Sequence, residues 1–259
     1  MKRLFVIYIL LLLAGNAYAQ TDLFGPQAAD PVTHTNVRKG WLFGVNGALL
    51  TSGADMAKRF GYGYTVGPMV EYKTAKNWIF GVKFDFLFGN QVKEDSLMTN
   101  IADKNGNMIG ADGVRTRPVV VERGYMVGLE AGKLLSISRN NKDKGILLLT
   151  SVGFIQHKIL IIDKNKTIPA IRGDYAKGYD RLTNGLFVEQ YAGYMHLSKN
   201  SLLNFHIGLD LLAGFTQGRR SYLYDVMRPD NKQRVDLLFG VRGGWYIPVF
   251  KRKSEELVF

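Results

Sequence analysis

One spacing in this 259-residue chain could support nucleophilic catalysis. His196 stands two residues before Ser198, and Asp210 follows twelve residues after the serine. A histidine next to a serine could activate the hydroxyl for attack on an ester, while a carboxylate orients the imidazole. The strand pattern described below gives Asp210 an inward parity but His196 and Ser198 an outward one. We therefore interpret them as an interfacial histidine and a turn serine, and we expect no catalytic residues and no enzymatic activity.

The residue types of the chain give little support for a metal-binding site. The chain has no cysteine, which excludes disulfide frameworks, cysteine-ligated zinc, iron–sulfur clusters and thiol catalysis. His206 and Asp210 share a strand face, but four residues along a strand span about 13 Å, too far for one ion. We interpret the histidine as an interior residue with a hydrogen-bond partner.

A short acidic run resembles the beginning of a calcium-binding loop. Residues 103–107 read Asp-Lys-Asn-Gly-Asn, but the sixth position is Met108 and the twelfth is Val114. A calcium loop needs Gly and Glu at those two places. We therefore expect no metal ion and no cofactor, and we interpret Asn105-Gly106 as the tight turn of a hairpin that extends above a membrane.

The elements that carry these residues alternate with a period of two. Over 78–88 the even positions are six large apolar residues, whereas the odd positions include Gly81, Lys83 and Asp85. A helix would scatter these charges around its axis, but a strand gathers the apolar groups on one face. The same reasoning predicts eight strands, near 41–50, 61–73, 78–90, 120–135, 145–158, 186–198, 202–216 and 235–250.

The lengths of the strands and connections indicate a membrane barrel. Most predicted strands are longer than the 5–6 residues, roughly, that are usual in soluble sheets. Connections after the odd-numbered strands hold 10 to 29 residues, whereas those after the even-numbered strands hold nine or fewer. Long loops on one side and tight turns on the other are typical of outer-membrane barrels. We predict an all-β, eight-stranded, antiparallel, transmembrane up-and-down β-barrel with long extracellular loops and short periplasmic turns.

The apolar rows of this barrel are expected to face lipid. They are almost unbroken and rich in Phe, Tyr and Trp, whereas the opposite rows hold Gly and a few charges that suit a narrow interior. A soluble barrel or sandwich, with the apolar rows inside, is the alternative.

The inward rows carry a candidate charge cluster. An eight-stranded barrel has room for packed side chains rather than a channel, and buried charges persist only when they are paired. We expect carboxylates to surround Lys83 and Arg242, with surplus carboxylates near the wet ends or protonated; a gated ion path is the alternative. The predicted cluster consists of Glu71, Lys83, Asp85, Glu130, Glu189, Asp210 and Arg242, and the same rows hold Glu122 and Asp236.

Four segments are expected along the chain. Residues 1–19 read as a signal peptide with Lys2 and Arg3, an apolar run of 11 residues and an Ala-Tyr-Ala cleavage site. A membrane-anchoring helix is the alternative, although the run is shorter than the ~20 residues that span a bilayer. Residues 20–40 are predicted to form an extended arm, 41–250 the barrel, and 251–259 a charged tail.

The eight alternating strands and the closing segment Gly-Gly-Trp-Tyr-Ile-Pro-Val-Phe (243–250) resemble the small OmpA/OmpX-type outer-membrane barrels of Gram-negative bacteria. The resemblance covers residues 41–250 and implies location in the cell outer membrane. It also implies that a C-terminal Phe is read by the barrel-assembly machinery; Phe250 and Phe259 are both candidates. The His-x-Ser arrangement is similar to that of outer-membrane lipid A deacylases, but those act on the outer leaflet, whereas the predicted turn is periplasmic.

The surplus of positive charge suggests partners. The formal net charge is +12, and no helix-borne basic patch or RNA-binding motif accompanies it, so we expect no nucleic acid. Outer-membrane lipid and lipopolysaccharide are the expected partners, because cations of the predicted outer loops could meet lipopolysaccharide phosphates; a simple solvated rim is the alternative. Periplasmic or membrane proteins are further possible partners. The loop cations are Arg115, Arg117, Lys164, Lys166, Arg219 and Arg220.

The favoured function is that of a non-enzymatic scaffold or accessory of an envelope or secretion-type assembly, such as type IX secretion. Three alternatives remain open. The first is a cell-surface ligand-binding or adhesion barrel that uses loops 91–119 and 159–185. The others are a narrow pore and a lipid A deacylase-like enzyme.

Overall fold

The chain divides into two units, Met1–His34 and Thr35–Phe259. The computed structural model describes residues 37–94, 96–138, 141–198 and 203–250, all of which belong to the second unit. The predicted signal peptide, most of the predicted arm and the predicted tail lie outside these residues.

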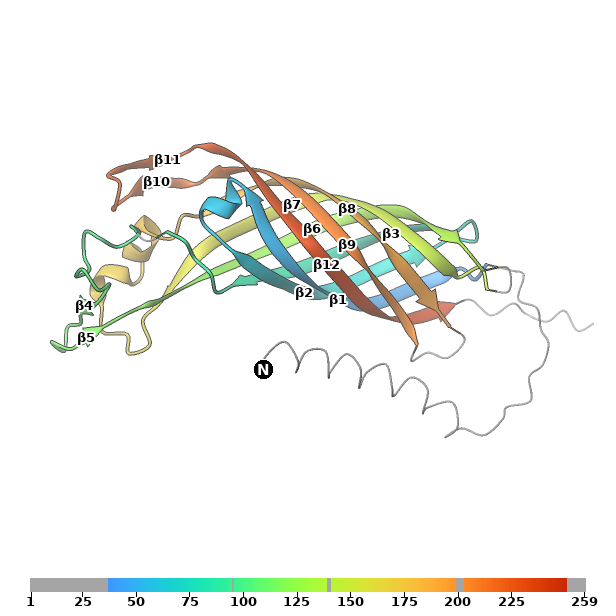
Figure 1. The fold of residues 1–259 in the computed structure, drawn as a ribbon, viewed down its shortest axis with the longest axis horizontal. Helices are drawn as coiled ribbons and strands as arrows, with labels where there is room; N and C mark the ends of the chain where they lie inside the picture. Colours follow the sequence, from blue (N-terminus) through green and yellow to red (C-terminus); the bar gives the residue numbers. More distant parts are fainter. Residues whose placement is uncertain (1–36, 95, 139–140, 199–202, 251–259) are drawn as a thin grey trace, which may run out of the picture. The chain divides into compact units, whose positions relative to one another are not determined.

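Eight long antiparallel strands form a closed barrel in the order β1-β12-β9-β8-β7-β6-β3-β2 (Figure 1). The last strand pairs with the first from Gly40↔Phe250 to Ala54↔Asp236, so every long strand has two neighbours. The predicted fold is confirmed. The strands are β1 (Gly40–Ala54), β2 (Tyr62–Lys73), β3 (Trp78–Gly89), β6 (Val119–Ser136), β7 (Lys144–Ile162), β8 (Thr183–Leu197), β9 (Asn204–Gly218) and β12 (Gln233–Phe250).

The short elements of the described chain lie in the connections at one end of the barrel, which we call the loop end. Two two-stranded hairpins extend there, as Figure 1 shows. The opposite end, the turn end, carries the connections 74–77, 137–143 and 198–203. The short elements are η1 (Met56–Lys58), β4 (Met108–Ile109), β5 (Arg115–Thr116), η2 (Pro169–Ile171), η3 (Tyr175–Gly178), β10 (Arg220–Leu223) and β11 (Arg228–Asp230).

Several strands run further towards the loop end than the alternation predicted. β1 continues to Ala54 instead of residue 50, and β7 continues to Ile162 instead of residue 158. Thr51, Ser52 and Gly53 interrupt the apolar pattern, yet their backbones still pair with β12. Pairing of the main chain does not require a lipid-facing side chain, so the ladder continues where the hydrophobic signal stops.

The hairpin predicted at Asn105-Gly106 lies elsewhere. β4 pairs with β5 through Met108↔Thr116 and Ile109↔Arg115, so the hairpin closes over residues 110–114. Gly113, in the left-handed region at φ 76°, sits in that turn. Gly106 also has a positive φ of 77°, but it belongs to a separate turn just before β4. Both glycines supply a backbone conformation that L side chains rarely adopt.

The outer wall of the barrel is apolar. Along β9, Leu209 and Leu211 are 68% and 53% exposed, whereas their neighbour Leu212 is 2% exposed. The tryptophans Trp41, Trp78 and Trp245 are exposed near the turn end, where amphipathic rings suit a membrane–water interface. Among the described residues, no helix is both long and apolar enough to cross a membrane.

The inside of the barrel contains two apolar clusters. The cluster nearer the turn end includes Leu42, Ile79 and Tyr246, and the cluster nearer the loop end includes Leu87, Ile155 and Leu212. Ionisable side chains occupy the level between them, and they form the centre of the candidate site.

Candidate functional site

Glu189 is the centre of the interior charge cluster. Both of its carboxylate oxygens lie 2.5 Å from Nζ of Lys83, and Oε1 also accepts a hydrogen bond of 2.6 Å from Nη1 of Arg242. All three side chains are almost completely buried. Because β3, β8 and β12 supply these residues, the ion pairs connect three strands across the inside of the barrel.

Three further carboxylates surround this centre at longer distances. Oδ2 of Asp85 lies 3.4 Å from Nζ of Lys83. Oδ1 of Asp210 and Oε2 of Glu130 lie 3.7 and 3.8 Å from Arg242 nitrogens. The Arg242 guanidinium also stacks 4.4 Å above the ring of Tyr191. The structure therefore brings six of the seven predicted residues into one group of charges.

The seventh predicted residue, Glu71, lies inside the barrel but outside that group. Oε1 accepts a hydrogen bond of 3.4 Å from the hydroxyl of Tyr246, and Oε2 has no hydrogen-bond partner among the described residues. The seven residues comprise two cations and five carboxylates. Complete ionisation would leave three negative charges without cationic partners in a level bounded by apolar clusters.

A second interior group lies nearer the loop end. His157 Nε2 and the hydroxyl of Thr216 lie 3.0 and 2.5 Å from Oδ2 of Asp236. The sequence placed Asp236 inside the barrel, but it gave no partner, because β7 is separated from β12 by two other strands and His157 reaches Asp236 only across the curved interior.

The turn end has an ion cluster that the sequence did not reveal. Asp143 accepts hydrogen bonds of 2.6 Å from Nε of Arg38 and 2.7 Å from Nζ of Lys73. The Arg38 guanidinium also donates to the carbonyls of Leu197 and Ser198 and lies 4.5 Å above the Phe250 ring. Arg38 belongs to the predicted arm of residues 20–40, so the last part of that arm is fixed against the barrel.

Ion pairs also join the loops at the other end. Glu94 accepts from Arg59 and Arg181 at 3.0 Å each, and Asp230 accepts from Arg59 at 3.3 Å and from Arg234 at 2.6 Å. Burial, followed by the nearby Arg234, lowers the pKa of the Arg59 guanidinium, whereas Glu94 and Asp230 act in the opposite direction. These contacts connect residues of all four loop-end connections and of β12.

Two of the predicted lipopolysaccharide-binding cations have partners within the protein. Arg220 donates to both carboxylate oxygens of Asp180, at 2.7 and 2.5 Å. Arg219 donates to the side chains of Asn184 and Gln217 at 2.6 and 3.1 Å. These arginines hold the fourth connection against β8 and the residues before it.

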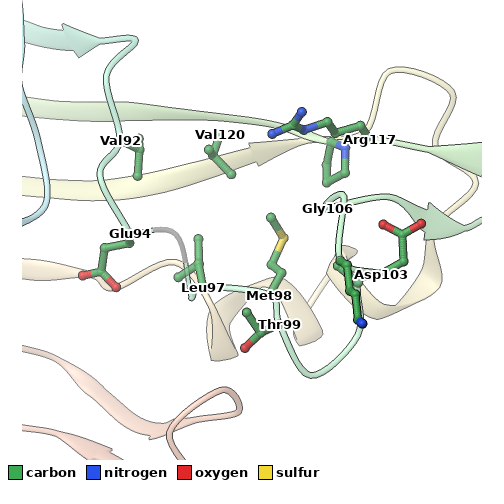
Figure 2. Close-up of a pocket in the computed structure, with 12 residues that line it drawn as sticks. Val92, Glu94, Leu97, Met98, Thr99, Asp103, Gly106, Arg117 and Val120 are labelled. Atoms are coloured by element: carbon green, nitrogen blue, oxygen red, sulfur yellow. The ribbon is translucent and has the colours of Figure 1, made fainter.

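A cavity of about 450 Å³ lies beside the long loop 90–118. Figure 2 shows Leu97 and Met98 pointing from the loop towards the segment that carries Arg117 and Val120. Apolar side chains form one part of the lining, and two cations, Lys104 and Arg117, are balanced by two carboxylates, Glu94 and Asp103. The cavity could hold a small molecule with both an apolar and a polar part.

The predicted catalytic spacing does not form a catalytic group. His196 stacks on Phe205, with ring centroids 5.5 Å apart and an interplanar angle of 4°, on the outer side of the barrel. Asp210 is buried in the interior group with Arg242. The wall of the barrel therefore separates the carboxylate from the imidazole that it would have to orient.

No group of three His, Asp or Glu side chains in the described part of the chain could hold a metal ion. His206 instead lies with Nδ1 2.8 Å from the hydroxyl of Tyr191. In the calcium-like run, Oδ1 of Asp103 accepts hydrogen bonds of 2.9 Å from the backbone N–H groups of Asn105 and Asn107. The bonds from Asn107, in first place, lower the pKa of Asp103.

The closed barrel and its exposed apolar wall together decide the class of protein. A closed barrel satisfies its main-chain hydrogen bonds internally, and an apolar wall of this extent faces lipid. In bacteria, barrels of this type span the outer membrane. The protein is an eight-stranded outer-membrane β-barrel.

The chain is similar to several solved structures at low sequence identity. No protein-family model and no curated protein sequence matches the chain. Neisserial surface protein A is 8% identical over 81% of this barrel protein and 97% of its own chain, with a TM-score of 0.45. The attachment invasion locus protein Ail of Yersinia pestis is 11% identical over 81% and 99%, with a TM-score of 0.39. OprG of Pseudomonas aeruginosa is 13% identical over 81% and 97%, with a TM-score of 0.36.

Proposed function

We propose that this outer-membrane barrel is a non-enzymatic, non-conducting scaffold or accessory subunit of an envelope assembly, such as a secretion machine. The observation that carries the proposal is the filled interior. Lys83, Glu189 and Arg242 form a buried ion-pair centre across the barrel, and an apolar cluster lies on either side of it. Side chains that fill an eight-stranded barrel leave no room for a water-filled path.

The surface at the turn end supports a role in binding a partner. Exposed cations surround this end, and the acidic Asp143 there is buried and already paired with Arg38 and Lys73. A face with this charge attracts an acidic periplasmic protein surface. Within the described residues, the exposed cations of this face are Lys39, Lys76, Lys133 and Lys142.

The first test is purification from envelopes in mild detergent after chemical crosslinking. The variant K76E/K142E reverses two charges at the turn end, and K104E/K164E makes the same change in charge at the loop end. We expect a co-purifying envelope protein that the turn-end variant loses and the loop-end variant keeps. A protein that always elutes alone, or that loses its partner equally in both variants, would contradict the proposal.

The second test is conductance in planar bilayers. The filled interior predicts that the reconstituted protein produces no steady channels. Stable unitary conductance that responds to changes at Lys83 or Glu189 would instead support the narrow pore.

A cell-surface binding protein is the second candidate function, and the cavity beside loop 90–118 favours it. Deleting residues 98–116 shortens this loop without removing β3 or β6. Loss of binding to a surface ligand, with heat-modifiable migration retained, would support the receptor. If the deletion leaves ligand binding and the phenotype of the cells unchanged, the result would support the scaffold.

A further inference from the structure

We propose that the cavity next to the β10–β11 hairpin binds a tetrahedral oxyanion, that is, a phosphate or sulfate ester group. The cavity has a volume of about 650 Å³. Its lining includes five cationic side chains but only two carboxylates, Glu94 and Asp230. The cations are Arg59, Arg181, Arg228, Lys232 and Arg234. This cavity shares one lining residue, Glu94, with the cavity beside loop 90–118, and it lies at the opposite end of the barrel from the turn-end surface.

Three of the arginines form a fixed framework. Glu94 lies between Arg59 and Arg181, and Asp230 lies between Arg59 and Arg234, all at 2.6 to 3.3 Å. Their side chains are only 6–11% exposed. Shared carboxylates hold the guanidinium groups in place before any ligand arrives, which reduces the ordering cost of binding.

The remaining two cations give the site its excess charge. A third carboxylate, that of Asp225, pairs with Arg181, so three arginines and three carboxylates balance. Arg228 and Lys232 are exposed, and neither forms an ion pair within the described residues. Two positive charges of the cavity lining are therefore available to an anion.

The backbone fixes where these two cations stand. Arg228 pairs with Leu223 across the hairpin, after Met227 at a positive φ of 52°. The carbonyl of Lys232 accepts hydrogen bonds from the Gly218 N–H at 3.2 Å and from Arg234 Nη1 at 3.1 Å. Both side chains thus start from constrained main-chain positions at the cavity.

A tetrahedral oxyanion fits this chemistry better than a carboxylate. Arginine presents several N–H donors in a planar fork, and lysine adds a compact charge, so together they match an anion with three or more oxygens. Such a group could belong to a soluble phosphorylated or sulfated molecule, or to a phosphorylated lipid headgroup. Both sources offer the same contacts, so experiment must separate them.

The test uses the full-length protein in detergent and pyrophosphate as the probe, followed by calorimetric titration at low salt. We expect the variant R228A/K232A to raise the Kd by at least about tenfold, because it removes two charged hydrogen-bond donors from the anion. The matched control R115A/K164A removes the same charge from other loop positions and should change the Kd less than about twofold. The variant R228K/K232R keeps the charge and should retain binding. Heat-modifiable migration verifies that each variant is folded.

A second arm identifies the source of the ligand. The protein is reconstituted in phosphatidylcholine vesicles with or without phosphorylated lipid A, and pyrophosphate binding is measured again. Competition by lipid A supports a lipid headgroup, whereas undiminished binding supports a soluble ligand; both outcomes support an oxyanion site. The absence of pyrophosphate binding, or equal losses in R228A/K232A and R115A/K164A, would overturn the proposal.

Discussion

Glu189 is the residue on which the interior ion pairs depend most. Its carboxylate binds both Lys83 and Arg242, so Glu189→Gln would leave two buried cations without their closest partner. Breaking such a buried pair typically costs about 3–5 kcal/mol. We expect a loss of this size in the free energy of unfolding, measured by urea titration in lipid vesicles.

Glu122→Gln is the matched control for that substitution. Glu122 is equally buried in the barrel, but its Oε1 has no hydrogen-bond partner among the described residues. Neutralising it should change the free energy of unfolding by less than about 1 kcal/mol. Equal losses for the two variants would show that Glu189 has no special structural role.

The pKa of Asp103 leads to a prediction about how the turn around it responds to pH. Hydrogen bonds from Asn107 lower the pKa of this carboxyl, so its stabilising effect is present at neutral pH. The effect is lost as the pH falls through this lowered pKa, which lies below the ordinary value of 3.8. The backbone N–H signal of Asn107 should titrate there in an NMR experiment and should not titrate in Asp103→Asn. A midpoint above the ordinary value of 3.8 would contradict the assignment of this turn.

At the scale of the element, neighbouring side chains of β9 lie in opposite environments. Leu211 faces outward and Leu212 faces the interior. Leu211→Arg should lower the free energy of unfolding in vesicles by about 2–4 kcal/mol, since a charge in the middle of the lipid-facing wall is poorly solvated. Tyr222→Arg, at an exposed site on β10, should have little effect. A tolerated arginine at Leu211 would show that this row does not face lipid.

Arg181 joins its own loop-end connection to two others. Its Nε donates to Glu94 at 3.0 Å, and its Nη2 pairs with Asp225. Arg181→Ala should therefore release loop 90–118 and accelerate its cleavage in limited proteolysis roughly tenfold, because local opening becomes easier. The exposed Arg172, which donates to the Lys166 carbonyl, offers a charge-matched control in Arg172→Ala. Identical cleavage rates would exclude a role for Arg181 in holding the loops.

The sequence predicted the barrel strands well because a strand with one lipid-facing side must alternate along its length. This rule placed Lys83 and Asp85 inside and separated Asp210 from His196. It could not find the end of β1, where polar residues continue the ladder. It also could not pair Arg59 with Glu94 or Arg38 with Asp143, because these residues lie outside the alternating strand segments, where no periodic pattern places a side chain.

At the scale of the whole molecule, the sequence predicts the interior of the barrel better than it predicts the contacts at the ends. The number of strands determines that the interior is narrow, so the sequence could predict packed charges around Lys83 and Arg242. The loop-end network depends on where four connections of different length meet, and no local pattern encodes that meeting. The oxyanion site between Arg228 and Lys232 was therefore visible only in the three-dimensional structure.

The apolar rows of the barrel strands face lipid, and the barrel inside them is filled. The chain contains no cysteine, so single cysteines can be introduced at each position of 204–218 and labelled with a nitroxide. Collision with a lipid-soluble relaxation agent is then measured in vesicles. We expect high accessibility at the odd positions from 205 to 215 and low accessibility at the even ones. High lipid accessibility at the even positions, or no alternation at all, would contradict this expectation.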